Sequence, residues 1–421
     1  MCYRVLDNLD MKYIFLVTLY TMVFFALASC GSGQKGERIP PVSPYDDDVA
    51  FLKKYGDVIE LTNSEGTSRI AVMPGLQARV MTSTAGAPGN LSYGWINRSF
   101  FESGDTSTHM NAFGGEERIW LGPEGGQYSI FFKKDSAFTF ENWHTPSVID
   151  LDAYDLVKQS PQSATFTKTA SLTNYSGTVF NIKIHREIKV LNSVDAFRLL
   201  GITPETTLTS VAYQTINKLE NTGETAWTKN SGLLSIWLLG MFNPSSDLTM
   251  VIPYIKGPTE VSGPVVNDDY FGKVPADRLK IADGVIFFKG DGEYRSKIGL
   301  TPARAMDVMG SYDASSKTLT IVKYSKGGPG DEYVNSKWEI QKAPYRGDVV
   351  NAYNDGPPSP GAKPMGPFYE LESSSPAKEL AQGESILHSQ ATFHFQGDEK
   401  ALDNVASQIL GVTISEINAV F

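Results

Sequence analysis

The chain has 421 residues, with 47 acidic and 37 basic side chains and a formal net charge of -10 at pH 7. Proteins that bind nucleic acid need clustered Lys and Arg to neutralise phosphates, so this balance argues against a nucleic-acid partner. The length would allow more than one domain, although large all-β folds of this size often form a single unit.

The N-terminus carries a predicted export signal. Met11 and Lys12 precede the apolar run YIFLVTLYTMVFFALA, which is followed by Ser29 and Cys30. A basic start, a short apolar core and small residues before a cut site are typical of a secretory signal, and the core is short for a membrane span. The letters LASC at 27–30 resemble the lipobox of bacterial lipoproteins, in which the cysteine becomes the lipidated first residue. The alternative is a plain signal peptide with an incidental cysteine.

We therefore predict that residues 1–30 are a lipoprotein signal peptide whose true start is Met11. Cys30 would anchor the mature chain in the bacterial cell envelope, with the lipid as its sole membrane contact. The other cysteine, Cys2, lies inside the signal, so the predicted mature chain has no disulfide and no cysteine nucleophile. Residues 31–45 are rich in Gly, Ser and Pro and predict a flexible tether.

The rest of the chain reads mainly as strands. A short helix is expected in DDDVAFLKKYG, and the alternation in TVFNIKIHREIKVL, residues 178–191, predicts a strand with one buried face, which Arg186 interrupts. DEKALDNVASQILGV near the end predicts a helix with one apolar stripe. Further strand candidates are SRIAVM, QYSIFF, SATFTKTASL, LLSIWLLGM, LTMVIPY, TLTIVKY and ILHSQATFHFQ.

This order of elements predicts an all-β fold. A long run of antiparallel strands with helices only at the ends favours one large, mostly antiparallel β-sandwich with few short helices over residues 46–421. The alternative is two domains, joined at GPTEVSGPVVND, residues 257–268.

The densest group of candidate binding residues lies in GGEERIWLGPEGG, residues 114–126. Its glycines let the backbone turn tightly or approach a ligand closely. Arg118 and Trp120 are two positions apart, so in a strand they share one face. An aromatic ring that stacks on a sugar, with charged groups such as Arg118 and Glu124 that bind hydroxyls, predicts a carbohydrate site. The alternative is a hairpin with a structural Arg–Glu pair.

A second candidate segment ends in two glutamates. Asn354 and Asp355 lie in the loop NAYNDGPPSPGAKPMG, residues 351–366, where they bind a ligand or simply build the turn. The chain continues into GPFYELESSSP, where Glu370 and Glu372 would point to the same face of a strand. Carboxylates are seldom buried without a partner. The two glutamates are therefore expected either to act on a ligand or to pair with Arg or Lys inside the sandwich.

The histidines do not form a metal-binding pattern. His109 is the one nearest the Gly-rich segment, and we assign it to the same binding site. His388 and His394 would share a strand face, but they lie about 20 Å apart at roughly 3.3 Å per residue. We predict no transition-metal centre and no cofactor, with a hard cation held by Asp and Glu as the open alternative.

With these residues in view, the chain resembles the galactose mutarotase-like superfamily, which includes the aldose 1-epimerases, and most closely a branch of bacterial lipoproteins within it. The resemblance covers roughly residues 50–421 and is carried by GGEERIWLGPEGG, LLSIWLLGMFNPSSDLTMVIPY and GPFYELESSSPAKELAQGESILHSQATFHFQG. It implies a β-supersandwich with a sugar site in its concave face. The family's catalytic Leu-Glu matches Leu371 and Glu372. The resemblance thus makes Glu372 the base that takes the proton of the anomeric hydroxyl, supported by Glu370.

The sequence departs from that family at the acid. The stretch YQTINKLENTGETAWTKNSGLLSIW, which should hold the family's histidine, has none, and its second histidine is at best replaced by His109. The leading hypothesis is an envelope lipoprotein that binds a carbohydrate in a concave cleft, with aldose 1-epimerase-type isomerase activity as its enzymatic form. The alternatives are a non-catalytic glycan-binding protein and a structural or assembly lipoprotein with a decayed site.

Overall fold

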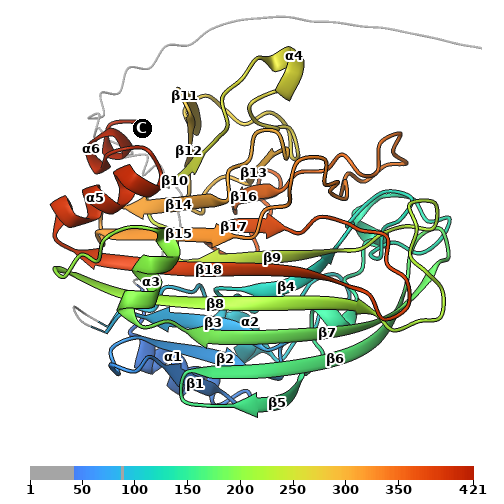
Figure 1. Ribbon diagram of the computed structural model, residues 1–421, viewed down its shortest axis with the longest axis horizontal. Coiled ribbons are helices and arrows are strands. Elements are labelled where there is room, and N and C mark those ends of the chain that lie inside the picture. The colour runs from blue at the N-terminus through green and yellow to red at the C-terminus, as the bar shows by residue number, and fades with distance from the viewer. Residues whose placement is uncertain (1–41, 87–89) are drawn as a thin grey trace, which may run out of the picture. The chain divides into compact units, whose positions relative to one another are not determined.

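The computed structural model describes residues 42–86 and 90–421, so the predicted signal peptide, Cys30 and most of the predicted tether lie outside the described residues. The strands of the described chain pair in an antiparallel manner and form three sheets (Figure 1). In this part of the chain, no helix has both the length and the apolar character needed to cross a membrane.

The largest sheet has ten strands, and its long central strands show why the sequence folds this way. In β7 the exposed and buried side chains alternate along the strand, as the period-two pattern predicts. Arg186 stays on the buried side because Glu117 pairs with it at 2.9 Å. In spatial order the strands are β11 (Leu279–Ala282), β12 (Val285–Lys289), β10 (Leu248–Pro253), β14 (Val308–Asp313), β15 (Thr318–Tyr324), β18 (Ser385–Gly397), β8 (Leu208–Asn221), β7 (Val179–Val190), β6 (Ser163–Thr173) and β5 (Asp155–Gln159).

Two smaller sheets complete the strand structure. The three-stranded sheet has the order β1 (Ile59–Thr62), β2 (Arg69–Met73) and β3 (Arg79–Thr84). The five-stranded sheet has the order β13 (Ser296–Leu300), β16 (Val350–Asn354), β17 (Tyr369–Ser374), β9 (Ser235–Phe242) and β4 (Arg118–Gly122). All strand pairs within the five-stranded sheet are antiparallel.

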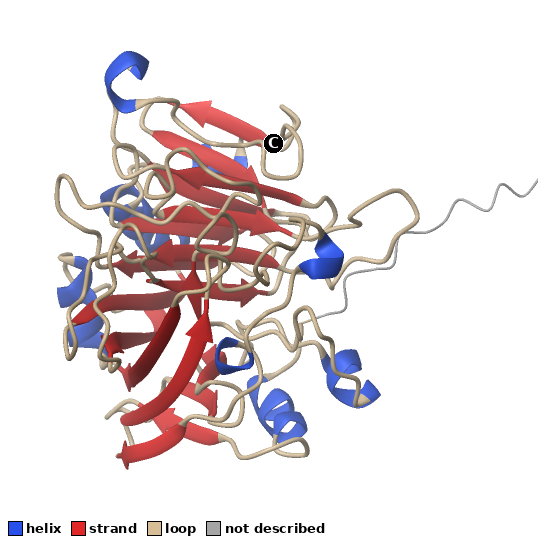
Figure 2. Cartoon of the chain, turned by 90° about the vertical axis from the view of Figure 1, so that its right-hand side faces the viewer, coloured by secondary structure: helices blue, strands red, loops and turns tan. Residues whose placement is uncertain are grey.

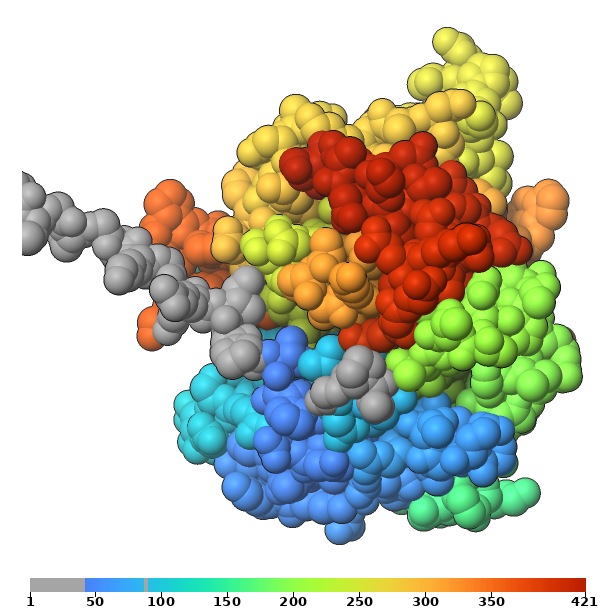
Figure 3. All heavy atoms as spheres, turned by 90° about the vertical axis from the view of Figure 1, so that its left-hand side faces the viewer, coloured from blue at the N-terminus to red at the C-terminus, as the bar shows by residue number. Residues whose placement is uncertain are grey.

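The helices are short and lie at the margins of the strands (Figure 2). The expectation that helices occur only at the ends is wrong. For example, Asn192 caps the interior helix α3 and Gly201 ends it in the left-handed conformation, both local signals. Figure 3 shows the green segment with α3 beside the red C-terminal helices, and their apolar side chains share one core cluster. The helices are α1 (Tyr45–Leu52), α2 (Arg98–Ser103), α3 (Ser193–Leu200), α4 (Thr259–Ser262), α5 (Glu399–Ile409) and α6 (Ile414–Asn418), with 3-10 turns η1 (Phe140–Asn142) and η2 (Ser147–Ile149).

Two local predictions need correction. The predicted tether extended to residue 45, but Tyr45 is fully buried at the start of α1 and its N–H donates to the carbonyl of Asn90 at 2.9 Å. The segment QYSIFF, residues 127–132, is expected to be a strand but forms none: its one ladder contact is an isolated antiparallel bridge between Phe132 and Trp143. Its buried apolar side chains pack in a loop.

The two faces of β17 have different surroundings. Tyr369 donates or accepts a 2.8 Å hydrogen bond with Ser311 of β14, and Ser373 bonds to Gln390 of β18 at 2.7 Å. These odd-numbered side chains therefore face the ten-stranded sheet across the sandwich. Glu370 and Glu372 must point to the opposite, outer face of the five-stranded sheet, because successive side chains alternate.

Candidate functional site

The outer face of the five-stranded sheet gathers charged and aromatic side chains from all five strands. Strand register places Tyr353 and Met241 beside Glu370, and Asn351 and Leu239 beside Glu372. From β4, Arg118 and Trp120 lie on the same face as these residues, and β13 adds Lys297. The predictions that Arg118 shares a face with Trp120, and Glu370 with Glu372, are confirmed.

An ion pair between Arg118 and Glu370 joins the two candidate segments, GGEERIWLGPEGG and GPFYELESSSP. Arg118 Nη2 lies 2.6 Å from Glu370 Oε1, and both side chains are almost fully buried. The guanidinium also lies 5.1 Å from the ring of Trp120, and its Nη1 donates to the sulfur of Met110 at 3.5 Å. A buried ion pair of this kind fixes both strands at the centre of the face.

Glu372 is held by two residues that the sequence analysis missed. Lys297 Nζ and Trp237 Nε1 each donate to Glu372 Oε2 at 2.9 Å. The Lys297 side chain is 13% exposed, whereas Glu372 is fully buried. Oε1 of Glu372 has no hydrogen-bond partner among the described residues. Both glutamates thus pair with a basic residue, although on the outer face of the sheet and not inside the sandwich, and one carboxylate oxygen is left unsatisfied.

The carboxyl groups of this face influence one another. Burial raises the pKa of Glu370 to about 7, with a further contribution from the charge of Glu372 and against the opposing effect of Arg118. Burial and the charge of Glu372 likewise raise the pKa of Glu124 to about 7, although that side chain is only half-buried. Burial lowers the pKa of Lys297, but the carboxylates of Glu372, Glu124 and Glu370 outweigh it and leave it above its ordinary value. Near neutral pH, Glu370 and Glu124 are therefore divided between their protonated and ionised forms.

Asn354, the last residue of β16, and Asp355, which follows it, were both predicted loop residues. Their side chains form hydrogen bonds with different parts of the structure. Asp355 is buried and accepts hydrogen bonds from the Tyr353 hydroxyl at 2.7 Å and the N–H of Gly366 at 2.9 Å. Burial raises the pKa of Asp355. Asn354 does not face the site, since its Oδ1 accepts from the N–H of Gly292 at 2.8 Å on the other side of the strand. Asn354 therefore points away from the face that holds Glu370 and Glu372, and its contacts fit the turn-building alternative.

Trp120 is not the open stacking platform that the sequence predicted. It is 3% exposed and packs edge-to-face against Trp237 at 5.5 Å, with Trp143 at 6.4 Å. The segment after β4 folds back over its ring, so no sugar can stack there without displacing that segment. Trp120 Nε1 has no partner among the described residues.

His109 lies at the margin of this face. Its Nδ1 donates to the carbonyl of Trp143 at 2.6 Å, and its ring packs at a tilt against Phe140, with 4.3 Å between the ring centroids. The next residue, Met110, contacts Arg118. The chain thus places His109 beside the predicted site, half-buried and without a contact to Glu370 or Glu372 in the hydrogen bonds of the described residues.

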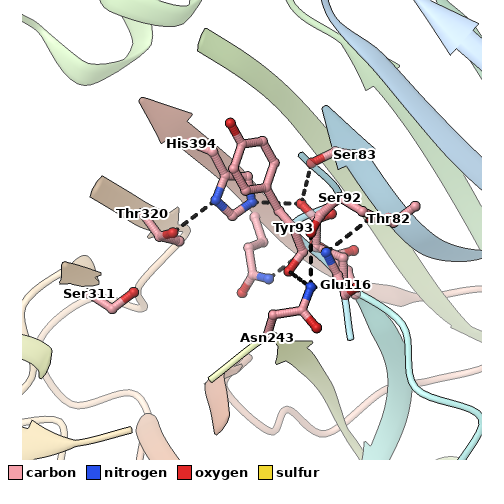
Figure 4. Close-up of polar contacts among 12 residues, drawn as sticks. Thr82, Ser83, Ser92, Tyr93, Glu116, Asn243, Ser311, Thr320 and His394 are labelled. Carbon is pink, nitrogen blue, oxygen red and sulfur yellow. Dashed lines mark hydrogen bonds and ion pairs between the residues drawn. The ribbon is translucent and has the colours of Figure 1, made fainter. Parts of the chain in front are cut away.

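A second polar cluster lies inside the sandwich and holds His394 of β18 (Figure 4). His394 Nε2 lies 2.8 Å from Glu116 Oε1, its Nδ1 lies 2.8 Å from Thr320 Oγ1, and its ring stacks on Tyr93 at 4.2 Å. His388 is also buried, with Nε2 2.8 Å from Ser373 Oγ, and burial lowers its pKa to about 3. Both histidines are committed to protein partners. Across residues 42–86 and 90–421, no group of three or more His, Cys, Asp or Glu side chains could hold a metal ion.

The sequence could have pointed to Trp237, because it lies in LLSIWLLGM, which predicts a strand with alternate faces. No comparable strand pattern in the sequence pointed to Lys297. It lies in the short segment SKIGL, whose pairing with β16 becomes evident only in the folded sheet.

Solved structures similar to this chain include proteins described as aldose 1-epimerases and galactose mutarotase-like proteins. The Slr1438 protein from Synechocystis sp. PCC 6803 is 11% identical, with 82% of this chain and 96% of that chain covered and a TM-score of 0.48. A putative aldose 1-epimerase from Escherichia coli K12 is 10% identical over 81% of this chain and 99% of its own, with a TM-score of 0.46. A galactose mutarotase-like protein from Lactobacillus casei is 10% identical over 80% and 100%, with a TM-score of 0.45.

These are the kinds of protein that the sequence resemblance named, and the mostly antiparallel sandwich with few short helices is the predicted fold class. The likeness is distant and concerns the fold alone. A search of curated proteins found no match. A family model matches residues 43–421, which are nearly all of the described residues. The chain belongs to that family, the family of unknown function DUF6786.

Proposed function

We propose that the protein binds a carbohydrate at the outer face of the five-stranded sheet, with Glu372 and Lys297 at the centre of the site. The observation that carries this proposal is the hydrogen bonding of the two carboxylate oxygens of Glu372. Lys297 and Trp237 occupy one carboxylate oxygen, while Oε1 is buried without a partner among the described residues. An unsatisfied buried acceptor costs about 1–3 kcal/mol. A sugar hydroxyl that donates to Oε1 would remove this cost.

The surrounding groups complement a sugar. Arg118 Nε and Trp120 Nε1 are further buried polar atoms without a partner in the described chain, and both are donors. A hydroxyl can donate and accept at once, so a polyol satisfies an acceptor and neighbouring donors together. The two central cations, Arg118 and Lys297, are each already paired with a carboxylate. A neutral sugar therefore fits this face better than an anionic one.

Ligand entry requires movement of the side chains that cover the face, because its unsatisfied atoms have no exposed surface. Tyr270 lies over it, with its ring 5.8 Å from Lys297 Nζ and its hydroxyl bonded to Asp348 and to Asn351. The neighbouring Phe271 is 47% exposed. We expect the segment of Tyr270 and Phe271 to move when a ligand binds.

A second candidate function is aldose 1-epimerase-type catalysis at the same face. Glu372 would accept the proton of the anomeric hydroxyl while the bond between C1 and the ring oxygen breaks. Glu370, whose pKa burial raises to about 7, lies on the same face and could return a proton to the ring oxygen. Reclosure on the other face of C1 would reverse both proton transfers. Glu370 would then replace the histidine that the sequence lacks at the expected place.

Calorimetry and saturation-transfer NMR with glucose, galactose, mannose and xylose test the binding proposal. Wild-type protein should bind at least one of them, and Glu372→Gln should weaken that binding by about tenfold or more, which is about 1.4 kcal/mol. Glu399→Gln, on an exposed carboxylate, is the matched control. No binding of any sugar by folded wild-type protein would refute the proposal. Polarimetry on freshly dissolved sugars tests catalysis, since an epimerase must exceed the rate in buffer.

A further inference from the structure

One edge of the ten-stranded sheet is bare. The strand at that edge is β5, which forms the lower margin of the sheet in Figure 1, and all five of its residues are exposed. Apart from the ladder with β6, no backbone hydrogen bond within the described residues involves residues 155–159. On the outer side of an edge strand, alternate N–H and C=O groups point away from the sheet. Those of β5 are therefore open to another strand.

Two other sheet edges of the described chain are covered. At the opposite edge of the same sheet, the carbonyl of Ala282 in β11 accepts a hydrogen bond from the hydroxyl of Tyr254 at 3.0 Å. At the β13 edge of the five-stranded sheet, Gly299 and Asn267 exchange two backbone hydrogen bonds of 2.8 Å. Proteins protect edge strands in such ways because an open edge pairs with other chains. The bare edge at β5 therefore indicates a contact surface.

The side chains of β5 suit a strand-to-strand contact. Leu156 is 45% exposed and Val157 is 63% exposed, so two neighbouring apolar side chains face solvent at the edge. A partner that removed them from water would gain free energy from their burial. Asp155 and Lys158 flank these two residues, and neither takes part in an ion pair within the described part of the chain. Both charges are therefore available to a partner.

A β-bulge places the two charged side chains on one face of the sheet. In the pairing with β6, Asp155 lies opposite Thr167 and Lys158 lies opposite Thr165, and the register shifts between Leu156 and Lys158. In a regular strand, residues three positions apart point to opposite faces. The extra residue of the bulge changes this. Asp155 and Lys158 therefore both lie on the face of Thr165 and Thr167, which is the outer face of the sheet.

We propose that β5 pairs with β5 of a second copy of this chain, in antiparallel orientation around a two-fold axis between Leu156 and Val157. In this register, Asp155 of each copy lies opposite Lys158 of the other, so the axis produces the same ion pair twice with the apolar side chains between them. The charge order of β5 is thus complementary to itself, which favours a second copy over an unrelated strand. The inference is independent of the proposed function, since β5 belongs to a different sheet from the proposed site. A single short strand pair is a small contact, so the dimer should be weak and reversible.

Sedimentation equilibrium of the full chain tests this inference. Every sample carries Cys30→Ser, so that no lipid takes part in the association, and is measured at concentrations up to about 1 mM. We expect a reversible equilibrium between monomer and dimer. Asp155→Lys or Lys158→Asp alone places like charges opposite each other at two points, and each should weaken the dimer by about tenfold or more. The double variant with both changes restores opposite charges and should recover most of the original affinity.

Lys280→Asp is the matched control, because it makes the same charge change at an exposed position of β11, the strand at the other edge of the sheet. It should leave the dimer affinity unchanged. Thermal melts should show every variant folded, since all the substituted side chains are exposed. A chain that stays monomeric at every concentration overturns the inference and shows that the bulge and the charges protect the edge instead. A dimer that the single changes do not weaken, or that the double change does not restore, overturns it as well.

Discussion

Lys297 Nζ lies 2.9 Å from Glu372 Oε2, so a residue of the edge strand β13 holds a carboxylate of β17 across the intervening strand β16. Trp237 donates to the same oxygen from β9 on the other side. Side chains from β13 and β9 thus both donate to the same carboxylate oxygen of β17. This arrangement leaves Oε1 free to accept from a ligand while the charge of the carboxylate is already balanced.

Lys297→Met should destabilise the fold, because it leaves the buried charge of Glu372 without its cation. Breaking a buried pair by removing one partner costs about 3–5 kcal/mol. Urea unfolding measures this, and adding Glu372→Gln to Lys297→Met should recover part of the loss. Lys256→Met, in the exposed pair with Asp283, should cost less than about 1 kcal/mol. Equal effects of the two lysine substitutions would contradict the assignment.

Glu370 should make stability depend on pH in a defined direction. Its pKa is raised to about 7 in the folded protein, so between its ordinary value and 7 the folded state holds a proton that the unfolded state has released. The stabilisation is present at acidic pH and is lost as pH rises through about 7. The unfolding free energy of wild type minus that of Glu370→Gln should therefore fall between pH 5 and pH 8. A difference that rises or stays flat over this window would show that the carboxyl is not protonated in the fold.

The pair of His394 and Glu116 should stabilise the sandwich without affecting the proposed site. Both side chains are buried and lie 2.8 Å apart inside the fold. Each of His394→Leu and Glu116→Leu should cost on the order of 3 kcal/mol, and the double variant should cost less than the sum of the two. Sugar affinity of the folded variants should equal that of wild type. A selective loss of binding at unchanged stability would move the functional site into this cluster.

Gly114→Ala should be strongly destabilising for two separable reasons. Gly114 has a φ of +90°, and a Cβ there would lie 2.1 Å from the carbonyl oxygen of Trp95. Gly104 also has a positive φ, +66°, but nothing lies within 4 Å of its Cβ position. Gly104→Ala should therefore cost about 1 kcal/mol from the backbone conformation alone. Thermal unfolding should show a clearly larger loss for Gly114→Ala, and equal losses would mean that the close approach is unimportant.

Cys30→Ser tests the predicted lipid anchor, which concerns residues outside the described part of the chain. If the cysteine is lipidated, the substitution should move the protein from the membrane fraction to the soluble fraction of the envelope. Cell fractionation with detection by antibody measures this. Wild-type protein that is already soluble would contradict the prediction.

The sequence by itself determined the local features of this protein. Period-two alternation predicted β7, the shared face of Arg118 and Trp120, and the shared face of Glu370 and Glu372, because side-chain direction in a strand depends only on position along the chain. The apolar stripe around Leu402 and Val405 predicted α5 for the corresponding reason in a helix.

The tertiary structure alone decided which of these faces meet. Lys297 joins Glu372 because β13, β16 and β17 are neighbours, although 75 positions separate the two residues in the chain. The segment after β4 buries Trp120, and the turn at Gly292 engages the side chain of Asn354. Strand order and loop packing follow from which distant surfaces bury the most apolar area together. That free energy belongs to the whole fold, and no local pattern in the chain contains it.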